Sequence, residues 1–125
     1  MTGIVLVTHS GLGESLRYQA EIILGRPLGL TTVSVSEDSD PDASLAELIG
    51  AISASMDPNG ALILTDLPGA TPHNLALKAA ASHDLPVVSG LNLPMLLKTV
   101  SYADKPALEL ARLADIGGHQ GITNQ

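Results

Sequence analysis

The sequence predicts an α/β fold in which helices cover both faces of a mainly parallel sheet. Short apolar runs alternate along the chain with longer stretches whose apolar residues recur at helical spacing. Strands that are continuously apolar are buried on both faces, which is typical of parallel sheets. The length of 125 residues corresponds to one domain. We therefore expect a single three-layer α/β/α domain of residues 1–125, with strand order 2-1-3-4.

The first half of the chain shows this alternation clearly. Leu12, Leu16 and Ala20 are near helical spacing, and Gly25 follows where a C-cap glycine belongs. The acidic segment 37–42 reads as a turn, and Asp-Pro-Asn-Gly at 57–60 is a strong turn signal. The expected elements are a strand over residues 3–8, a helix over 12–24, a strand over 30–35 and a helix over 41–56.

The second half continues the pattern. Thr71 and Pro72 resemble an N-cap followed by proline at the first helical position. The Gly117-Gly118 pair is expected to end the last helix. The expected elements are a strand over residues 61–65, a helix from Thr71 to about His83, a strand over 86–89, a helix over 93–101 and a helix over 105–116.

Composition excludes several classes of function. The net charge of −7 disfavours nucleic acid and anionic membranes as partners and favours proteins with a basic face. The chain lacks Phe and Trp, which argues against stacking on bases, and it lacks Cys, which excludes thiolate chemistry. Because no signal peptide or membrane-spanning run is apparent, we expect no membrane insertion and a cytoplasmic location.

The candidate site lies where the first and third strands end. In doubly wound sheets these strands are neighbours, so His9 and Asp66 should face each other. Imidazole is a good nucleophile near neutral pH, and a carboxylate can hold one ring N–H and free the other nitrogen. Taken singly, His9 could be an ordinary surface residue and Asp66 a turn-initiating residue.

The surroundings of this pair suit a phosphoryl group. Helices follow Ser10-Gly11 and Thr71, and the N-termini of helices stabilise anions. Gly11 and Gly69 allow the backbone to approach a ligand closely. Thr71 could act as an N-cap, as a phosphate donor or as both. The spacing of the four histidines shows no metal-binding pattern, so neither a metal nor a cofactor is expected.

Several motifs in order carry a family resemblance over essentially the whole chain. The sequence resembles the mannose-type IIA component of the bacterial phosphoenolpyruvate-dependent sugar phosphotransferase system. The matching segments are Ile4-Val5-Leu6-Val7-Thr8-His9, Leu16 through Ala20-Glu21-Ile22-Ile23-Leu24-Gly25, Leu64-Thr65-Asp66-Leu67 with Gly69-Ala70-Thr71-Pro72-His73-Asn74, and Gly90-Leu91-Asn92-Leu93-Pro94-Met95.

The resemblance implies a phosphotransferase component that acts as a phosphohistidine carrier. His9 matches the phosphorylated histidine, Asp66 matches the aspartate that bonds its other ring nitrogen, and Thr71 matches a serine beside the phosphate. The implied donor is the small carrier HPr, and the implied acceptor is a IIB component. The family also implies a homodimer that exchanges a C-terminal antiparallel edge strand, here around residues 119–123.

The sequence departs from the family pattern near the site. Ser10 and Ala70 stand where the family usually has glycine, and Thr71 replaces a serine. His73 occupies a commonly aromatic position and is interpreted as a surface residue of a helix, within the expected docking surface.

Three alternatives to sugar uptake remain open at this point. The chain could be a regulatory module that reports the phosphorylation state of His9 without transport. It could be the phosphodonor domain of a dihydroxyacetone kinase system, which is similar to this family. It could also be a plain small-molecule-binding α/β domain, which fits the fold but does not account for the pairing of His9 with Asp66.

Overall fold

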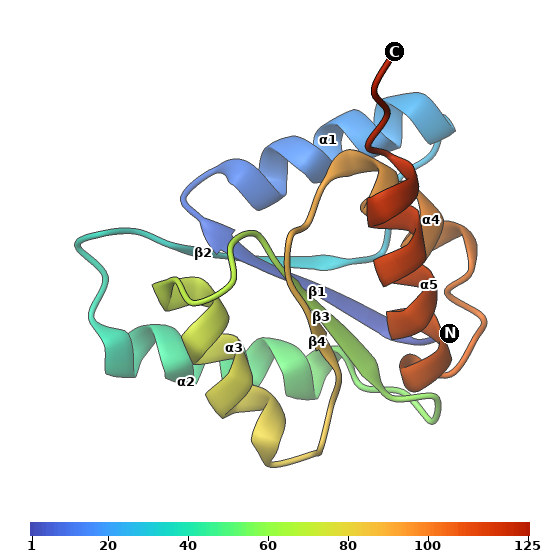
Figure 1. Cartoon of the computed structure of the whole chain (residues 1–125). Helices are drawn as coiled ribbons and strands as arrows, with labels where there is room; N and C mark the ends of the chain where they lie inside the picture. Colours follow the sequence, from blue (N-terminus) through green and yellow to red (C-terminus); the bar gives the residue numbers. More distant parts are fainter.

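The structure, a computed structural model, describes all 125 residues and is built on one four-stranded sheet (Figure 1). The strand order is β2-β1-β3-β4, and every neighbouring pair is parallel. This order confirms the one expected from the sequence. The strands are β1 (Gly3–His9), β2 (Thr31–Val35), β3 (Ala61–Thr65) and β4 (Val87–Val88).

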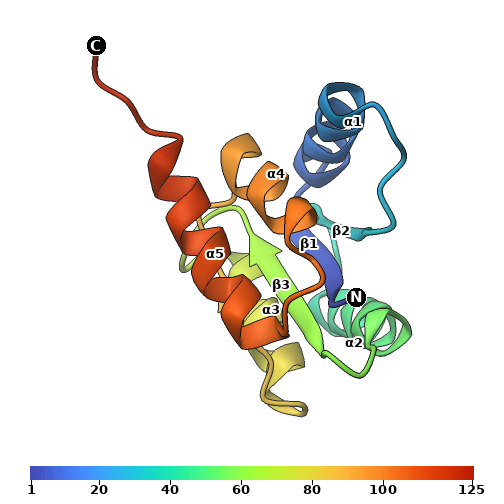
Figure 2. The same cartoon turned by 90° about the vertical axis from the view of Figure 1, so that its right-hand side faces the viewer.

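Helices cover both faces of the sheet. One layer is formed by α1, α4 and α5, and the other by α2 and α3, as the two orthogonal views show (Figures 1 and 2). The helices are α1 (Leu12–Leu24), α2 (Pro41–Ser55), α3 (Thr71–Ala81), α4 (Leu93–Ser101) and α5 (Ala107–Gln120). None of them is long and apolar enough to cross a membrane.

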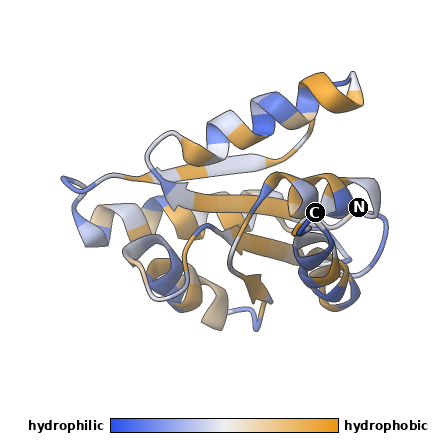
Figure 3. Ribbon diagram, turned by 45° about the horizontal axis from the view of Figure 1, so that its top comes forward, coloured by the Kyte–Doolittle hydropathy of each residue, from blue (hydrophilic) through white to orange (hydrophobic).

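Two apolar cores lie between the sheet and the helical layers. Alternate residues of β1 point to opposite faces, so Ile4 and Leu6 pack beneath the layer of α1, α4 and α5, whereas Val5 and Val7 pack against α2 and α3. The central strands are hydrophobic and the loops that join the elements are largely hydrophilic (Figure 3). Burial on both faces explains the continuously apolar strands of the sequence.

The last helix is longer than the sequence predicts. Gly117 and Gly118 were expected to end it, but both are buried within α5, which continues to Gln120. A Cβ atom on Gly117 would lie 2.6 Å from the Cβ of Lys98, and one on Gly118 would lie 2.9 Å from the Cε of Met95. These glycines therefore let α5 approach α4 closely and do not act as caps.

The chain as described has no fifth strand. His119 and Gln120 are helical and residues 121–125 have no regular structure, so the edge strand expected around residues 119–123 is not confirmed. The C-terminal residues extend away from the molecule (Figures 1 and 2). An exchanged strand obtains its hydrogen bonds from the sheet of a second subunit, so a single chain offers this segment no partner.

Candidate functional site

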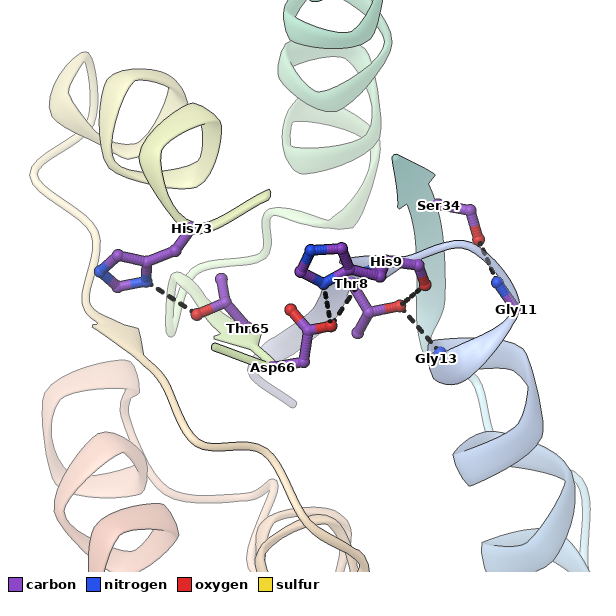
Figure 4. Close-up of polar contacts among 8 residues, drawn as sticks. All are labelled: Thr8, His9, Gly11, Gly13, Ser34, Thr65, Asp66 and His73. Atoms are coloured by element: carbon purple, nitrogen blue, oxygen red, sulfur yellow. Dashed lines mark hydrogen bonds and ion pairs between the residues drawn. The ribbon is translucent and has the colours of Figure 1, made fainter. Parts of the chain in front are cut away.

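His9 is the last residue of β1 and lies at the carboxyl edge of the sheet. His9 pairs with Val35 of β2, and the His9 side chain is 50% exposed. The backbone N–H of His9 donates to Oδ2 of Asp66 at 2.9 Å, and ring Nδ1 lies 2.7 Å from the same oxygen (Figure 4). The predicted pairing of His9 with Asp66 across β1 and β3 is therefore present in the structure.

Asp66 selects the tautomer of the neutral His9 ring. Its side chain is only 7% exposed. Burial alone would raise the pKa of this carboxyl, but the hydrogen bonds from the His9 backbone and ring, with the attraction to the ring, outweigh burial and lower the pKa. An ionised carboxylate can only accept, so Nδ1 of His9 carries the proton and Nε2 keeps a free lone pair.

A buried threonine holds His9 relative to α1. The Thr8 hydroxyl accepts from the Gly13 N–H at 2.9 Å and donates to the carbonyl oxygen of His9 at 2.8 Å (Figure 4). Gly13 is buried, and a Cβ atom there would lie 3.2 Å from the Thr8 hydroxyl oxygen. The strand end and the helix start are therefore tied together by a side chain that does not face the solvent.

Backbone N–H groups at the start of α1 already form hydrogen bonds within the chain. Gly11, the N-cap residue with φ of 82°, donates its N–H to the Ser34 hydroxyl at 3.4 Å. That hydroxyl in turn donates to the Glu14 carboxylate, whose oxygens lie at 2.8 and 2.9 Å. This contact from Ser34, followed by the backbone N–H of Glu14, lowers the pKa of the Glu14 carboxyl. The first turn of α1 thus already contains an ionised acceptor.

The start of α3 differs from the sequence prediction. Ala70 is the N-cap and Thr71 is the first helical residue, so the N-cap role expected for Thr71 is wrong. The helix begins one residue earlier than expected, with Pro72 in its first turn. Thr71 is exposed and its hydroxyl forms no hydrogen bond within the chain, which leaves it available to a ligand. Gly69 has a φ of 82°, which favours glycine.

A polar pocket of about 260 Å³ opens beside His9. The side chains that line it come from the ends of β1 and β2, the loop after β2, and the starts of α2 and α3. They are His9, Val35, Ser36, Glu37, Ser39, Pro41, Ser44, Thr71, Pro72 and Leu75.

The loop after β2 is a part of the site that the sequence analysis did not single out. It lies at the same edge of the sheet as the loops after β1 and β3, and it supplies two pocket serines, Ser36 and Ser39. Ligands of such sheets bind at the carboxyl ends of the strands, and applying this rule to β2 as well would have identified the loop. Ser10, predicted as a phosphate ligand, lines a shallower hollow next to this loop with Glu37 and Asp38.

The other histidines do not join His9. Nδ1 of His73 lies 2.8 Å from the hydroxyl of the buried Thr65, so this half-buried residue is not the surface residue that the sequence suggested (Figure 4). His119 forms an exposed ion pair with Asp115 at 2.9 Å on α5. No group of three or more His, Cys, Asp or Glu side chains is arranged to hold a metal ion.

Comparison with known families and structures gives consistent matches over the whole fold. The family model described as "PTS system fructose IIA component" (EIIA-man) matches residues 3–115. No curated protein sequence matches the chain.

Solved structures match almost end to end. A mannose/sorbose-specific IIA subunit of the phosphotransferase system from Enterococcus faecalis is 27% identical, with a TM-score of 0.89 over 99% of this chain and 94% of that one. Component EIIA from Streptococcus agalactiae is 24% identical, with a TM-score of 0.88 over 99% and 97%. The IIA protein associated with the fucose utilization operon of Streptococcus pneumoniae is 22% identical, with a TM-score of 0.84 over 98% and 92%.

Proposed function

This chain belongs to the EIIA-man family of phosphotransferase-system fructose IIA components, and on that premise we propose that His9 accepts a phosphoryl group from phospho-HPr and passes it to a IIB component. Membership of the family implies a phosphocarrier role in sugar uptake and makes the chain a phosphotransferase component. The proposal treats residues 1–125 as one IIA domain and places the exchange in the cytoplasm.

The observation that carries the proposal is the hydrogen bond between Nδ1 of His9 and Asp66. In the proposed step the lone pair of Nε2 attacks phosphorus, the new N–P bond forms, and the N–P bond to the donor imidazole breaks. The donor ring leaves with that electron pair. Asp66 stabilises the positive charge that develops on the His9 ring, and no proton has to move during transfer.

The half-exposed position of His9 supports exchange between proteins. A donor histidine must reach Nε2 in line, so the acceptor ring has to be accessible from the surface, as it is here. The hydroxyl of Thr71 and the start of α3 line the same pocket and are suited to bind phosphoryl oxygens. Ser10, Gly11 and Gly69 remain predicted contacts of the phosphoryl group.

The family match favours sugar uptake over the other candidate functions. The family and the three similar structures described above are named for phosphotransferase-system IIA components, and these names favour neither a purely regulatory module nor a dihydroxyacetone kinase domain. The named sugars differ among the relatives, and the pocket beside His9 gives no reason to assign one to this chain.

The proposal is tested by phosphorylation in solution. Incubation with ³²P-labelled phosphoenolpyruvate, enzyme I and HPr should place an acid-labile label on the wild-type protein. His9→Ala should abolish the label, whereas His83→Ala, an exposed histidine after α3, should leave it unchanged. Equal labelling of His9→Ala would mean that another residue is the acceptor. Addition of a purified mannose-type IIB component should then remove the label from the wild type.

A further inference from the structure

Ser44 is a nearly buried residue whose hydroxyl has no hydrogen-bond partner in the chain. It lies in the second turn of α2 and is only 7% exposed. Its backbone N–H donates to Asp40 within the helix at 2.9 Å, but its hydroxyl forms no hydrogen bond with any group of the chain. By contrast, the nearby hydroxyls of Ser36 and Ser39 bond to each other at 2.8 Å. A hydroxyl that has no partner in the chain is free to donate a hydrogen bond to a group that binds from outside.

Ser44 lines the same cavity as His9, and Thr71 borders that cavity from α3. Side chains of α2 and α3 can therefore both contact a group bound to Nε2 of His9. None of the residues that line the cavity is Lys or Arg, so only hydroxyls and helix dipoles can hold an anion there.

The start of α2 borders the cavity, whereas no residue of α1 lines it. At the start of α1, the N–H groups of the N-cap residue Gly11 and of Gly13 donate to Ser34 and Thr8. At the start of α2, a helix of 15 residues, Pro41 has no N–H and the Ala43 N–H donates to the side chain of Asp40 at 3.3 Å. The positive end of α2 therefore opens on the cavity together with the unpartnered hydroxyl of Ser44.

We propose that Ser44 is a phosphoryl-binding residue, whose hydroxyl donates a hydrogen bond to an oxygen of the phosphoryl group on Nε2 of His9. This inference rests on the function proposed above and adds α2 to the site. Ser44 keeps its proton throughout and forms no covalent bond. It stabilises negative charge on the phosphoryl oxygens, both while the group is being transferred and while it resides on His9.

Carboxylates near the cavity limit how tightly it can hold the phosphoryl group. Glu37 borders the cavity, and Asp40 and Asp42 lie at the start of α2. All three are exposed, so solvent screens their repulsion of the bound anion. We expect a site that binds the phosphoryl group through hydroxyls, without a cationic side chain, to orient the group and still release it to an acceptor.

The test compares Ser44→Ala with Ser53→Ala, which removes an exposed hydroxyl near the other end of the same helix. Single-turnover transfer from phospho-HPr and the half-life of the isolated phosphoprotein are measured for both variants and for the wild type. Loss of one hydrogen bond to a charged group corresponds to roughly a tenfold change in rate. We expect Ser44→Ala to slow transfer and shorten the half-life by about that factor, and Ser53→Ala to match the wild type.

Melting temperatures distinguish a role of Ser44 in phosphoryl binding from a role in the stability of the fold. Because the Ser44 hydroxyl has no partner in the chain, Ser44→Ala should melt within about 2 °C of the wild type. If Ser44→Ala does not fold, Ser44→Cys, which has a similar volume and is a weak donor, is judged by the same two measurements. Wild-type rates and half-lives in the folded variant would overturn the inference and leave the labelling of His9 intact. A wild-type protein that is not labelled on His9 would overturn both proposals.

Discussion

At the scale of single residues, the site depends on one carboxylate oxygen that serves two donors. Oδ2 of Asp66 accepts from both the backbone and the ring of His9, whereas Oδ1 is buried and has no partner. The sequence predicted the pair because strand ends can be read from apolar runs. It could not predict the shared oxygen or the unpartnered one, since both depend on the orientation of a side chain.

Replacing Asp66 with Asn tests the role of this charge. The amide can accept a hydrogen bond but cannot stabilise a positive ring, so we expect labelling by phospho-HPr to slow by about 10- to 100-fold. The protein should still fold, which a circular dichroism spectrum would confirm. Labelling of Asp66→Asn at the wild-type rate would contradict the orienting and electrostatic role of Asp66.

The same variant should change the dependence of stability on pH. The pKa of Asp66 is lower in the folded state than its ordinary value, so its ionised form stabilises the fold fully above the unfolded pKa of about 3.9. That contribution is lost as the pH falls below about 4 and through the folded pKa. In urea unfolding at several pH values, the stability advantage of the wild type over Asp66→Asn should therefore shrink below about pH 4. A difference that stays constant with pH would contradict the lowered pKa.

At the scale of elements, the starts of three helices converge near His9, but they are not equivalent. The sequence singled out the loops before α1 and α3, because His9 and Asp66 drew attention to the first and third strands. The start of α2 was read only as an acidic turn. Apolar periodicity cannot show which of several serines in a polar segment becomes buried, since that depends on how α2 packs against its neighbours.

Replacing two helical glycines with Ala should change stability in opposite directions, because only one of them lies in the close contact of α4 with α5. Gly117→Ala would place a Cβ atom 2.6 Å from the Cβ of Lys98, which cannot move without the backbone of α4. Overpacking should outweigh the better helix propensity of Ala and lower the free energy of unfolding by about 1–2 kcal/mol. Gly50→Ala, where a Cβ would meet open space on α2, should raise it by about 0.5–1 kcal/mol. Urea denaturation measures both, and stabilisation by Gly117→Ala would show that the helices can separate at no cost.

At the scale of the whole molecule, the topology followed from the sequence, whereas the expected homodimer stays a prediction. Alternating strands and helices leave few arrangements for a parallel sheet, and the observed order is the expected one. The expected C-terminal edge strand is not seen in the single chain, and its exchange with a second subunit stays a prediction. His73 was misread because its partner, Thr65, is brought near by the packing of α3 on β3.

The net charge of −7 predicts how association with a basic donor responds to salt. Acidic residues also border the surface around His9, including Glu37 and Asp38. Raising the ionic strength from about 50 to 500 mM should lower the second-order rate constant for transfer from phospho-HPr by roughly tenfold, since screening removes the steering of the encounter. At saturating donor the rate should change little. A second-order rate constant that is independent of salt would exclude an electrostatically steered encounter.

The double contact of His9 with Asp66 also has a consequence for the direction of exchange. The backbone N–H of His9 holds the carboxylate that bonds ring Nδ1, so we expect the ring to keep its orientation when a group is attached to Nε2. A donor therefore meets a ring that needs no rearrangement, and an acceptor finds the same ring in the same place. For the exchange proposed here, little reorganisation separates the loaded and empty forms, and the phosphoryl group should pass in either direction according to the relative amounts of charged donor and acceptor.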